Sequence, residues 1–249
     1  MSEPDDLQDL SFDEVSRTVH REHTHRKVND GGPRAAVFGA SDGLVSNVSL
    51  ILGVAAASPA SGVVRLAGIA GWIAGAVSMA AGEYISMRAQ AELLERELAV
   101  EREAQLLHPE LETIELAKIY ESRGLEPELA REMAVSMMRD PEIALEAHAR
   151  DELGIDPDEL GSPIVAAVWS FAAFSIGALV PLVPWLIGGG TGAIVASVVL
   201  GALGAAALGA IVGTFTGRSL WYSAARQTLI AAVAAAITYG IGSLVGVGV

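Results

Sequence analysis

The chain has 249 residues, a net charge of −14, a positive mean hydropathy of +0.43 and no cysteine. The absence of cysteine excludes disulfides and thiolate metal sites, so a soft metal would have to rely on methionine and histidine. The acidic balance argues against nucleic acid as a partner and favours cations.

The charge is concentrated in one segment. Residues 88–159 hold twenty acidic and eight basic residues, a net charge of −12. Residues 161–249 contain no aspartate or glutamate, and most of the remaining chain is Ala, Gly, Val, Leu and Ile. Because an apolar run of about 20 residues spans a ~30 Å hydrocarbon core, the pattern predicts an all-α polytopic membrane protein with a charged insert.

Residues 1–33 form a polar tail that begins acidic and turns basic. Its basic part contains His20, His23 and His25, which would bind a metal weakly or, more simply, lie in a solvated stretch beside the membrane. The tail has no early apolar core, so we do not expect a cleaved signal peptide.

Five apolar segments are each long enough to span a membrane. They cover residues 35–57, 63–87, 163–187, 191–217 and 226–248. Lysine and arginine are frequent in the tail, in the insert and around 218–226, and nearly absent from the two intervening loops. Since cytoplasmic loops carry the excess of these residues, we expect a cell-membrane protein with its N-terminus and insert in the cytoplasm and its C-terminus outside.

These boundaries divide the chain into four parts. A cytoplasmic tail (1–33) is followed by two transmembrane helices (34–87), a cytoplasmic helical domain (88–160) and three further transmembrane helices (161–249).

Small residues recur every four positions in two of the apolar segments. One set is Gly71 and Gly75, and the other comprises Gly201, Ala205, Gly209, Gly213 and Gly217. Small residues at this spacing let helices approach closely in lipid, either within one chain or between two subunits.

The insert is predicted to be helical throughout. The second apolar segment should continue without a break to Leu107, because residues 88–107 contain no glycine or proline and are rich in Ala, Glu and Leu. Shorter helices are expected over 110–122, 125–138 and 141–153, ended by Gly124, by Pro141 and by Gly154.

Two carboxylates, Asp42 and Glu83, lie inside the apolar segments of residues 34–87. Serines and glycines surround Asp42, and Met79 lies on the same helical face as Glu83. Carboxylate, thioether and hydroxyl groups together suit Fe²⁺ or Mn²⁺, and carboxylates also exchange protons. The alternative is that both are structural acids, with Asp42 bonded to serine and Glu83 paired with Arg88.

The insert repeats pairs of possible ligands at helical spacing. The pairs are Glu97 with Glu101, Glu112 with Glu115, and His148 with Glu152. Such pairs on several helices are typical of metal sites held in a bundle, although glutamate-rich helices are often only solvated surfaces. Met133, Met137 and Met138 are interpreted as core residues.

Several motifs resemble the vacuolar iron transporter (VIT) family. They are FGASDGLVSN, AGAVSMAAGEYISMRAQ, the acidic insert ending in HARDELG, and ALVPLVPW, in an order that covers about residues 25–249. The resemblance implies five transmembrane helices, a homodimer with the ion path at the subunit interface, and a cytoplasmic metal-binding domain on the extended second helix. It also implies export of Fe²⁺ and often Mn²⁺ from the cytoplasm, with proton exchange.

The resemblance also assigns roles by position. Asp42 and Met79 match the family's pore aspartate and methionine. Glutamates that hold metal in plant relatives are matched by Glu101, Glu112, Glu115 and Glu152. Ala104 replaces one such glutamate, and His148 with Ala149 replaces a pair of methionines.

Three functions follow from these observations. The first is a non-enzymatic transporter of divalent metal through Asp42, Met79 and Glu83. The second is a membrane-anchored di-iron oxidase, which would need matched Glu-x-x-His steps from two helices. The third is a metal sensor or structural membrane module.

Overall fold

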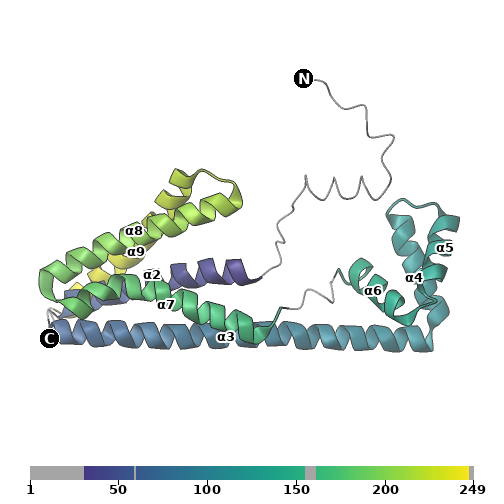
Figure 1. Ribbon diagram of the computed structural model, residues 1–249, viewed down its shortest axis with the longest axis horizontal. Coiled ribbons are helices and arrows are strands. Elements are labelled where there is room, and N and C mark those ends of the chain that lie inside the picture. The colour runs from purple at the N-terminus through teal and green to yellow at the C-terminus, as the bar shows by residue number, and fades with distance from the viewer. Residues whose placement is uncertain (1–30, 59, 155–160, 247–249) are drawn as a thin grey trace, which may run out of the picture. The chain divides into compact units, whose positions relative to one another are not determined.

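A computed structural model describes residues 31–58, 60–154 and 161–246, and this part of the chain contains helices and no strand (Figure 1). The predicted all-α class is therefore confirmed. Residues 1–30, which hold the three histidines of the polar tail, lie outside the described residues. The helices are α2 (Gly31–Ala57), α3 (Ser61–Leu107), α4 (Pro109–Ser122), α5 (Pro127–Met137), α6 (Pro141–Asp151), α7 (Pro163–Ile187), α8 (Gly190–Thr216) and α9 (Leu220–Gly246).

Five of the helices are long and apolar enough to cross a membrane, as the sequence predicts. They are α2 from Ala36, the first part of α3, and α7, α8 and α9. Helix α9 begins at Leu220, six residues before the expected start of the last span at residue 226. Gly217 ends α8 in the left-handed conformation (φ 66°). Arg226 then lies inside α9, where its long side chain does not interrupt the helix.

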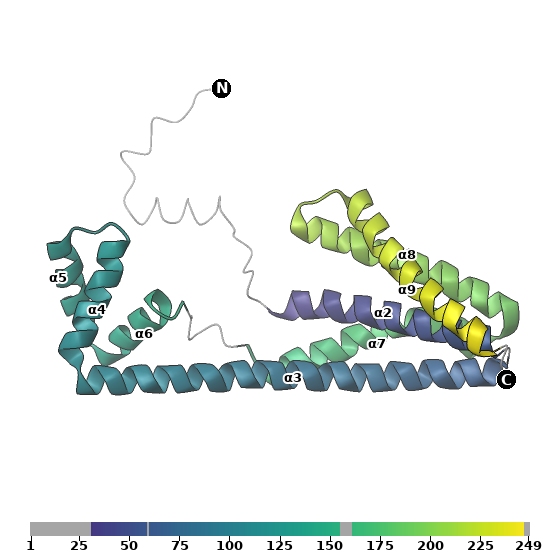
Figure 2. The ribbon, with the colours of Figure 1, turned by 180° about the vertical axis from the view of Figure 1, so that it is seen from behind.

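Helix α3 is one continuous helix of 47 residues, and Figure 2 shows it running without interruption through both the membrane-spanning segment and the insert. At 1.5 Å per residue it is about 70 Å long, more than twice the thickness of a hydrocarbon core. The predicted continuation of the second span to Leu107 is confirmed. The structure therefore joins the insert to the membrane through a single rod.

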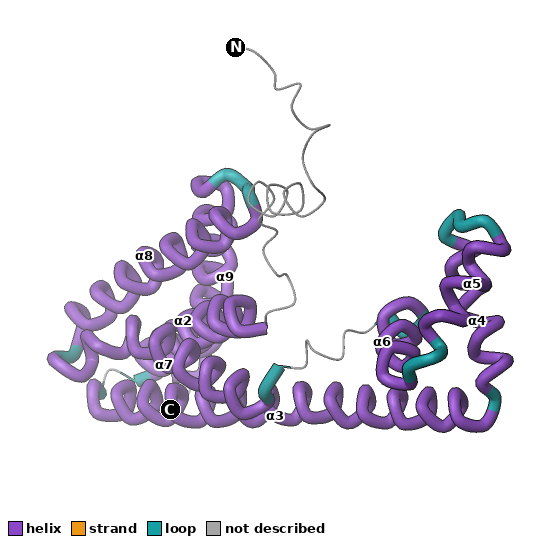
Figure 3. Tube along the Cα trace, turned by 45° about the vertical axis from the view of Figure 1, so that its right-hand side comes forward, coloured by secondary structure: helices purple, strands orange, loops and turns teal. Residues whose placement is uncertain are grey.

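Helix α7 packs against both α2 and α3, among the helices that Figure 3 shows gathered around α2. Its contact with α2 is a backbone-to-backbone crossing. A Cβ atom on Gly177 would lie 2.0 Å from the carbonyl oxygen of Ala40, and one on Gly43 would lie 2.1 Å from that of Phe174. Only glycine fits at these two positions, so α2 and α7 approach more closely than side chains would allow.

Side chains from three helices bind carbonyl groups in the proline-containing half of α7. Asn47 on α2 donates to Ala178, and Ser197 on α8 donates to Pro181, each at 2.7 Å. Arg65 on α3 donates to the carbonyl of Trp185 at 2.8 Å. Prolines at 181 and 184 interrupt the regular helical bonding here, and cross-helix donors of this kind stabilise such a segment in lipid.

The glycine stripe of α8 is used inside the chain. Gly209 and Gly213 face Ser223 on α9, while Gly201 faces Val48 on α2. Gly71 and Gly75 of α3 face Leu50 and the Phe174 ring. Of the two roles that the four-residue spacing allows, the described chain shows the internal one for both sets.

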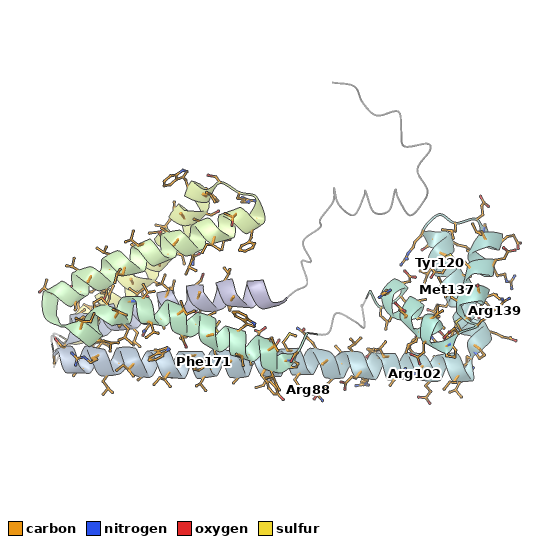
Figure 4. The ribbon with its side chains drawn as sticks, in the orientation of Figure 1. Arg88, Arg102, Tyr120, Met137, Arg139 and Phe171 are labelled. Carbon is orange, nitrogen blue, oxygen red and sulfur yellow. The ribbon has the colours of Figure 1, made fainter. Side chains whose placement is uncertain are left out.

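The three short helices of the insert share a small core. It is built from Leu116, Ala117, Tyr120, Ala130, Ala134 and Ala147, with Leu125, Met133 and Met137 packed against it. The expected role of Met133 and Met137 as core residues is confirmed. Figure 4 shows Tyr120 and Met137 on neighbouring helices, and the Tyr120 hydroxyl lies 3.2 Å from the Met137 sulfur.

Candidate metal centre and ion path

A fully buried imidazole lies between carboxylates at the base of the insert. His148, on α6, is 0% exposed. Its Nδ1 is 3.7 Å from Glu101 Oε1 on α3, and its Nε2 is 3.6 Å from Glu112 Oε2 on α4. Both glutamates are themselves buried, at 8% and 9% exposure. Three helices, the consecutive α3 and α4 and the later α6, therefore bring ligand-type atoms to one point.

Glu152, at the C-cap of α6, completes a group that could hold a metal ion. Ligand atoms of Glu101, His148 and Glu152 all lie within 4.8 Å of one another. Glu152 is exposed, so it faces the solvent side of the group. Carboxylate and imidazole ligands suit Fe²⁺ and Mn²⁺, and also Zn²⁺.

Two of the candidate glutamates are not members of this group of three. Glu115 lies one turn beyond Glu112 on α4 and is exposed, and Glu97 lies one turn before Glu101 on α3 and is half-buried. Neither belongs to the group of three that shares one point. Glu115 still acts electrostatically, because its charge helps to raise the pKa of both Glu112 and Glu152.

Backbone carbonyls face both ring nitrogens of His148. Nδ1 lies 2.9 Å from the carbonyl oxygen of Ala144, and Nε2 lies 3.4 Å from that of Glu112. Contacts of this kind fix the orientation of the ring, as backbone carbonyls commonly do for metal-binding histidines.

Gln105 is a site residue that the sequence reading missed. Its amide donates to Glu101 Oε1 at 3.1 Å and lies 3.2 Å from His148 Nδ1. It lies four residues after Glu101, on the same face of α3, and that spacing was the available signal.

Burial raises the pKa of Glu112 and of Glu152, and the negative charge of Glu101 raises both further. His148 opposes the shift in each case. Crowded carboxylates that resist ionisation bind protons in place of a cation, and a divalent ion relieves their mutual repulsion. A divalent ion bound by this group would therefore displace the protons that these carboxylates hold.

Acidification is expected to stabilise the metal-free insert as the pH falls through the raised pKa values of Glu112 and Glu152 toward 4.5, the ordinary value for glutamate. In this window the folded state holds protons that the unfolded chain has released, so stability is lost as the pH rises through the raised pKa values. The pKa of Asp151 is lowered because bonds from Tyr120 and Arg123 outweigh its burial, and its contribution is lost only below pH 3.8.

Amide hydrogen exchange over residues 109–151, measured across this pH range, checks the prediction. Protection should increase toward acid without metal, and Mn²⁺ should reverse the trend because it binds the ionised carboxylates. Protection that falls steadily from pH 7 to pH 5 without metal would contradict it.

In the membrane segment, Asp42 lies on the outer face of α2. It is exposed, and Ser46 donates a hydrogen bond to its Oδ1 at 3.1 Å. Phe38, one turn before Asp42, and Leu50, one turn after Ser46, are 66% and 37% exposed. A carboxylate therefore points outward from one chain within a membrane-spanning helix.

Met79 and Glu83 lie one turn apart on α3, and both are half-buried. Met79 packs against the cluster of Ala76, Phe174 and Ala178. Phe174 contacts Gly43 through its backbone and Gly75 through its ring, so α7 reaches between the two helices at this level. Within the described part of one chain, no hydrogen bond or ion pair joins Asp42 to Glu83.

A second stripe of small residues runs along α3 and was not singled out from the sequence. Its members are all exposed and lie four residues apart: Ala70, Ala74, Ser78, Gly82 and Ser86. The stripe is offset by one position from Gly71 and Gly75. The same spacing thus marks two faces, one packed inside the chain and one open.

The chain is similar to proteins of known family along almost its whole length. The sequence profile of the VIT family matches residues 33–243. Vacuolar iron transporter 1 of Oryza sativa subsp. japonica is 32% identical over 238 residues, covering 95% of this chain and 94% of that protein. The vacuolar iron transporter of Acanthamoeba castellanii is 37% identical over 222 residues, covering 86% and 78%. Vacuolar iron transporter 1 of Arabidopsis thaliana is 30% identical over 246 residues, covering 98% of each.

Proposed function

The chain belongs to the VIT family, and on this basis we propose that it transports divalent iron across a membrane. We further propose that it carries Mn²⁺, that it exports metal from the cytoplasm, and that protons move in exchange. Asp42, Met79 and Glu83 form the transport path in this proposal. The group around His148 collects metal from the cytoplasm.

The exposed position of Asp42 carries the proposal. An ionised carboxylate in a membrane-spanning helix costs about 3 kcal/mol or more, so it needs a partner or a water-filled surrounding. Within the described part of one chain, the hydrogen bond from Ser46 is the polar contact of the outward-facing Asp42 carboxylate. A path for cations along this face would give the carboxylate a partner ion and a water-filled surrounding.

A homodimer supplies the other wall of that path. Two copies that meet through the outer faces of α2 and α3 would enclose both Asp42 carboxylates. The exposed small-residue stripe of α3 supports this arrangement, since such stripes let helices of two subunits approach closely.

Cysteine cross-linking is expected to detect this interface. The chain has no cysteine, so single substitutions give a clean background. Ser46→Cys on α2 and Ser78→Cys on α3, both exposed, should yield cross-linked dimers in membranes with a short bifunctional maleimide. Ser175→Cys, at a buried position on α7, is the matched control. A transport-active protein that gives no dimer from either exposed position would contradict the interface.

The proposed cycle begins in the insert, where ionised Glu101, Glu112 and Glu152 raise the local metal concentration and His148 adds a nitrogen ligand. Metal then passes to Met79 and Asp42. Protons arriving from the outside neutralise the carboxylates and release it. The raised pKa values of Glu112 and Glu152 support the first step, because these groups exchange a proton for a cation readily.

The proposed sidedness follows the distribution of lysine and arginine, with the N-terminus and the insert in the cytoplasm and the C-terminus outside. The relatives are named for the vacuole, whereas the cell membrane is our expectation for this chain. In both cases metal would leave the cytoplasm.

Flux into proteoliposomes tests the function. Competitive uptake of Fe²⁺ and Mn²⁺ is measured with and without an imposed pH gradient. Uptake that rises with an acidic interior supports proton exchange. Uptake that does not change with the pH gradient would exclude proton exchange. Absence of uptake would exclude transport of these metals.

The oxidase alternative is less well supported by the site. A di-iron centre of the bundle type uses a histidine from each of two helices. The shared group in the described insert contains the single histidine His148. The sensor alternative predicts metal binding without flux, which the same vesicles would reveal.

A further inference from the structure

The ends of α4 and α6 are tied together at Asp151, the last residue of α6. The Tyr120 hydroxyl donates to Asp151 Oδ2 at 2.8 Å. The Arg123 guanidinium pairs with Oδ1 of the same carboxylate, and its Nη2 donates to the Asp151 backbone carbonyl at 2.9 Å. We call Tyr120, Arg123 and Asp151 the α6 clamp.

The clamp adds little to what already holds the insert together. Its Arg123 and Asp151 side chains are 48% and 22% exposed, and ion pairs at such exposure contribute about 0–1 kcal/mol to stability. The apolar core that includes Tyr120 and Ala147 already joins α4 to α6. The contribution of the clamp to stability is therefore small, and its position beside the metal-binding group suggests a different role.

Directly after the clamp comes Glu152, which differs from the other members of its group. Glu101 and His148 are buried on interior turns of their helices. Glu152 is exposed and caps α6, where its backbone N–H donates to the carbonyl of His148 at 2.9 Å. Helix ends fray unless they are tied down, so this ligand is the one whose position depends most on a neighbour.

We propose that Tyr120 and Arg123 are positioning residues for the metal centre: through Asp151 they fix the end of α6 and hold the Glu152 carboxylate within reach of Glu101 and His148. The inference rests on the proposed role of this group in metal binding. Tyr120 and Arg123 would not touch the metal but would support one of its ligands. Substitutions of such supporting residues commonly change metal affinity 10- to 100-fold.

A double-mutant cycle separates positioning from general stabilisation. Mn²⁺ affinity of the full-length protein in detergent is measured by electron paramagnetic resonance of the free ion, for Arg123→Gln, Glu152→Gln and the double variant. Arg123→Gln should weaken binding about tenfold in the native background. It should have less than a twofold further effect once Glu152 is replaced, because no positioned ligand remains.

The sign of the change is itself diagnostic. Removing a positive charge near a cation site would by itself strengthen binding. Arg102→Gln is the matched control, since it removes an exposed arginine that pairs with Glu142 at the other end of α6. Tyr120→Phe removes one hydroxyl without changing charge, and it should weaken binding in the same Glu152-dependent way.

The outcomes distinguish this inference from the function on which it rests. Equal weakening in both backgrounds, or unchanged affinity in Arg123→Gln and Tyr120→Phe, overturns the clamp. Native protein that does not bind Mn²⁺, or Glu152→Gln that binds as tightly as the native protein, overturns the proposed metal group itself.

Discussion

Asp42→Asn is expected to reduce metal flux at least about a hundredfold while leaving the protein folded and assembled. The substitution keeps the size of the side chain and its hydrogen bond with Ser46, and it removes only the charge. Two opposite unit charges about 4 Å apart near a protein surface attract by about 4 kcal/mol, and each 1.4 kcal/mol corresponds to a factor of ten. The loss for a divalent ion should therefore reach the background rate of empty vesicles.

Flux of Fe²⁺ and Mn²⁺ into proteoliposomes is the measurement for Asp42→Asn, with cross-linking through Ser78→Cys as the check on assembly. Ser46→Ala is a suitable comparison, because it removes only a neutral hydrogen-bond partner of the carboxylate. It should reduce metal flux far less than Asp42→Asn does. Glu92→Gln serves as a second one, since it removes a carboxylate that pairs with Arg88 at the surface. Undiminished flux through Asp42→Asn would exclude this carboxylate from the path.

Gly177→Ala should destabilise the membrane bundle by about 3 kcal/mol or more, although it adds a single methyl group. The new Cβ would lie 2.0 Å from the carbonyl oxygen of Ala40 and 2.9 Å from the backbone nitrogen of Leu44. Backbone atoms cannot rotate out of the way as side chains can, so α2 and α7 would have to separate. Because α2 carries Asp42, flux should fall together with stability.

Thermal unfolding in detergent measures this cost for Gly177→Ala. Gly240→Ala is the matched control, since Gly240 lies inside α9 and a Cβ there would meet nothing within 4 Å in the chain. If Gly177→Ala unfolded at the same temperature as Gly240→Ala and the native protein, the close crossing of α2 and α7 would be refuted.

Helix positions in this chain were largely predictable, because local signals set them. Pro109, Pro127, Pro141 and Pro163 each begin a helix, where proline lacks only an N–H that would be unbonded anyway. Gly124 follows α4 with a φ of 98°, as expected for a terminating glycine. The sequence does not predict the helix start at Leu220, because Arg218 and Arg226 favour a loop between them.

The spacing of residues along one helix does not determine which neighbouring helix a given face packs against. Glu101 and His148 were placed in separate pairs, and packing of α6 against α3 brings them to 3.7 Å. For the same reason the small residues at positions 71 and 75 could not be distinguished from those at 70 and 74. The first pair packs inside the chain, and the second is exposed.

The unbroken helix α3 also constrains how the length of this segment can change. Each residue of an α-helix turns the chain by about 100° and advances it 1.5 Å, and between Met87 and Glu97 there is no glycine or proline at which a change could be absorbed. Removing one residue there would swing Glu101 about a quarter turn around the axis relative to Met79. Removing seven would shorten the rod by about 10 Å and nearly restore the phase. Natural length variation in this segment should therefore occur in steps of about seven residues.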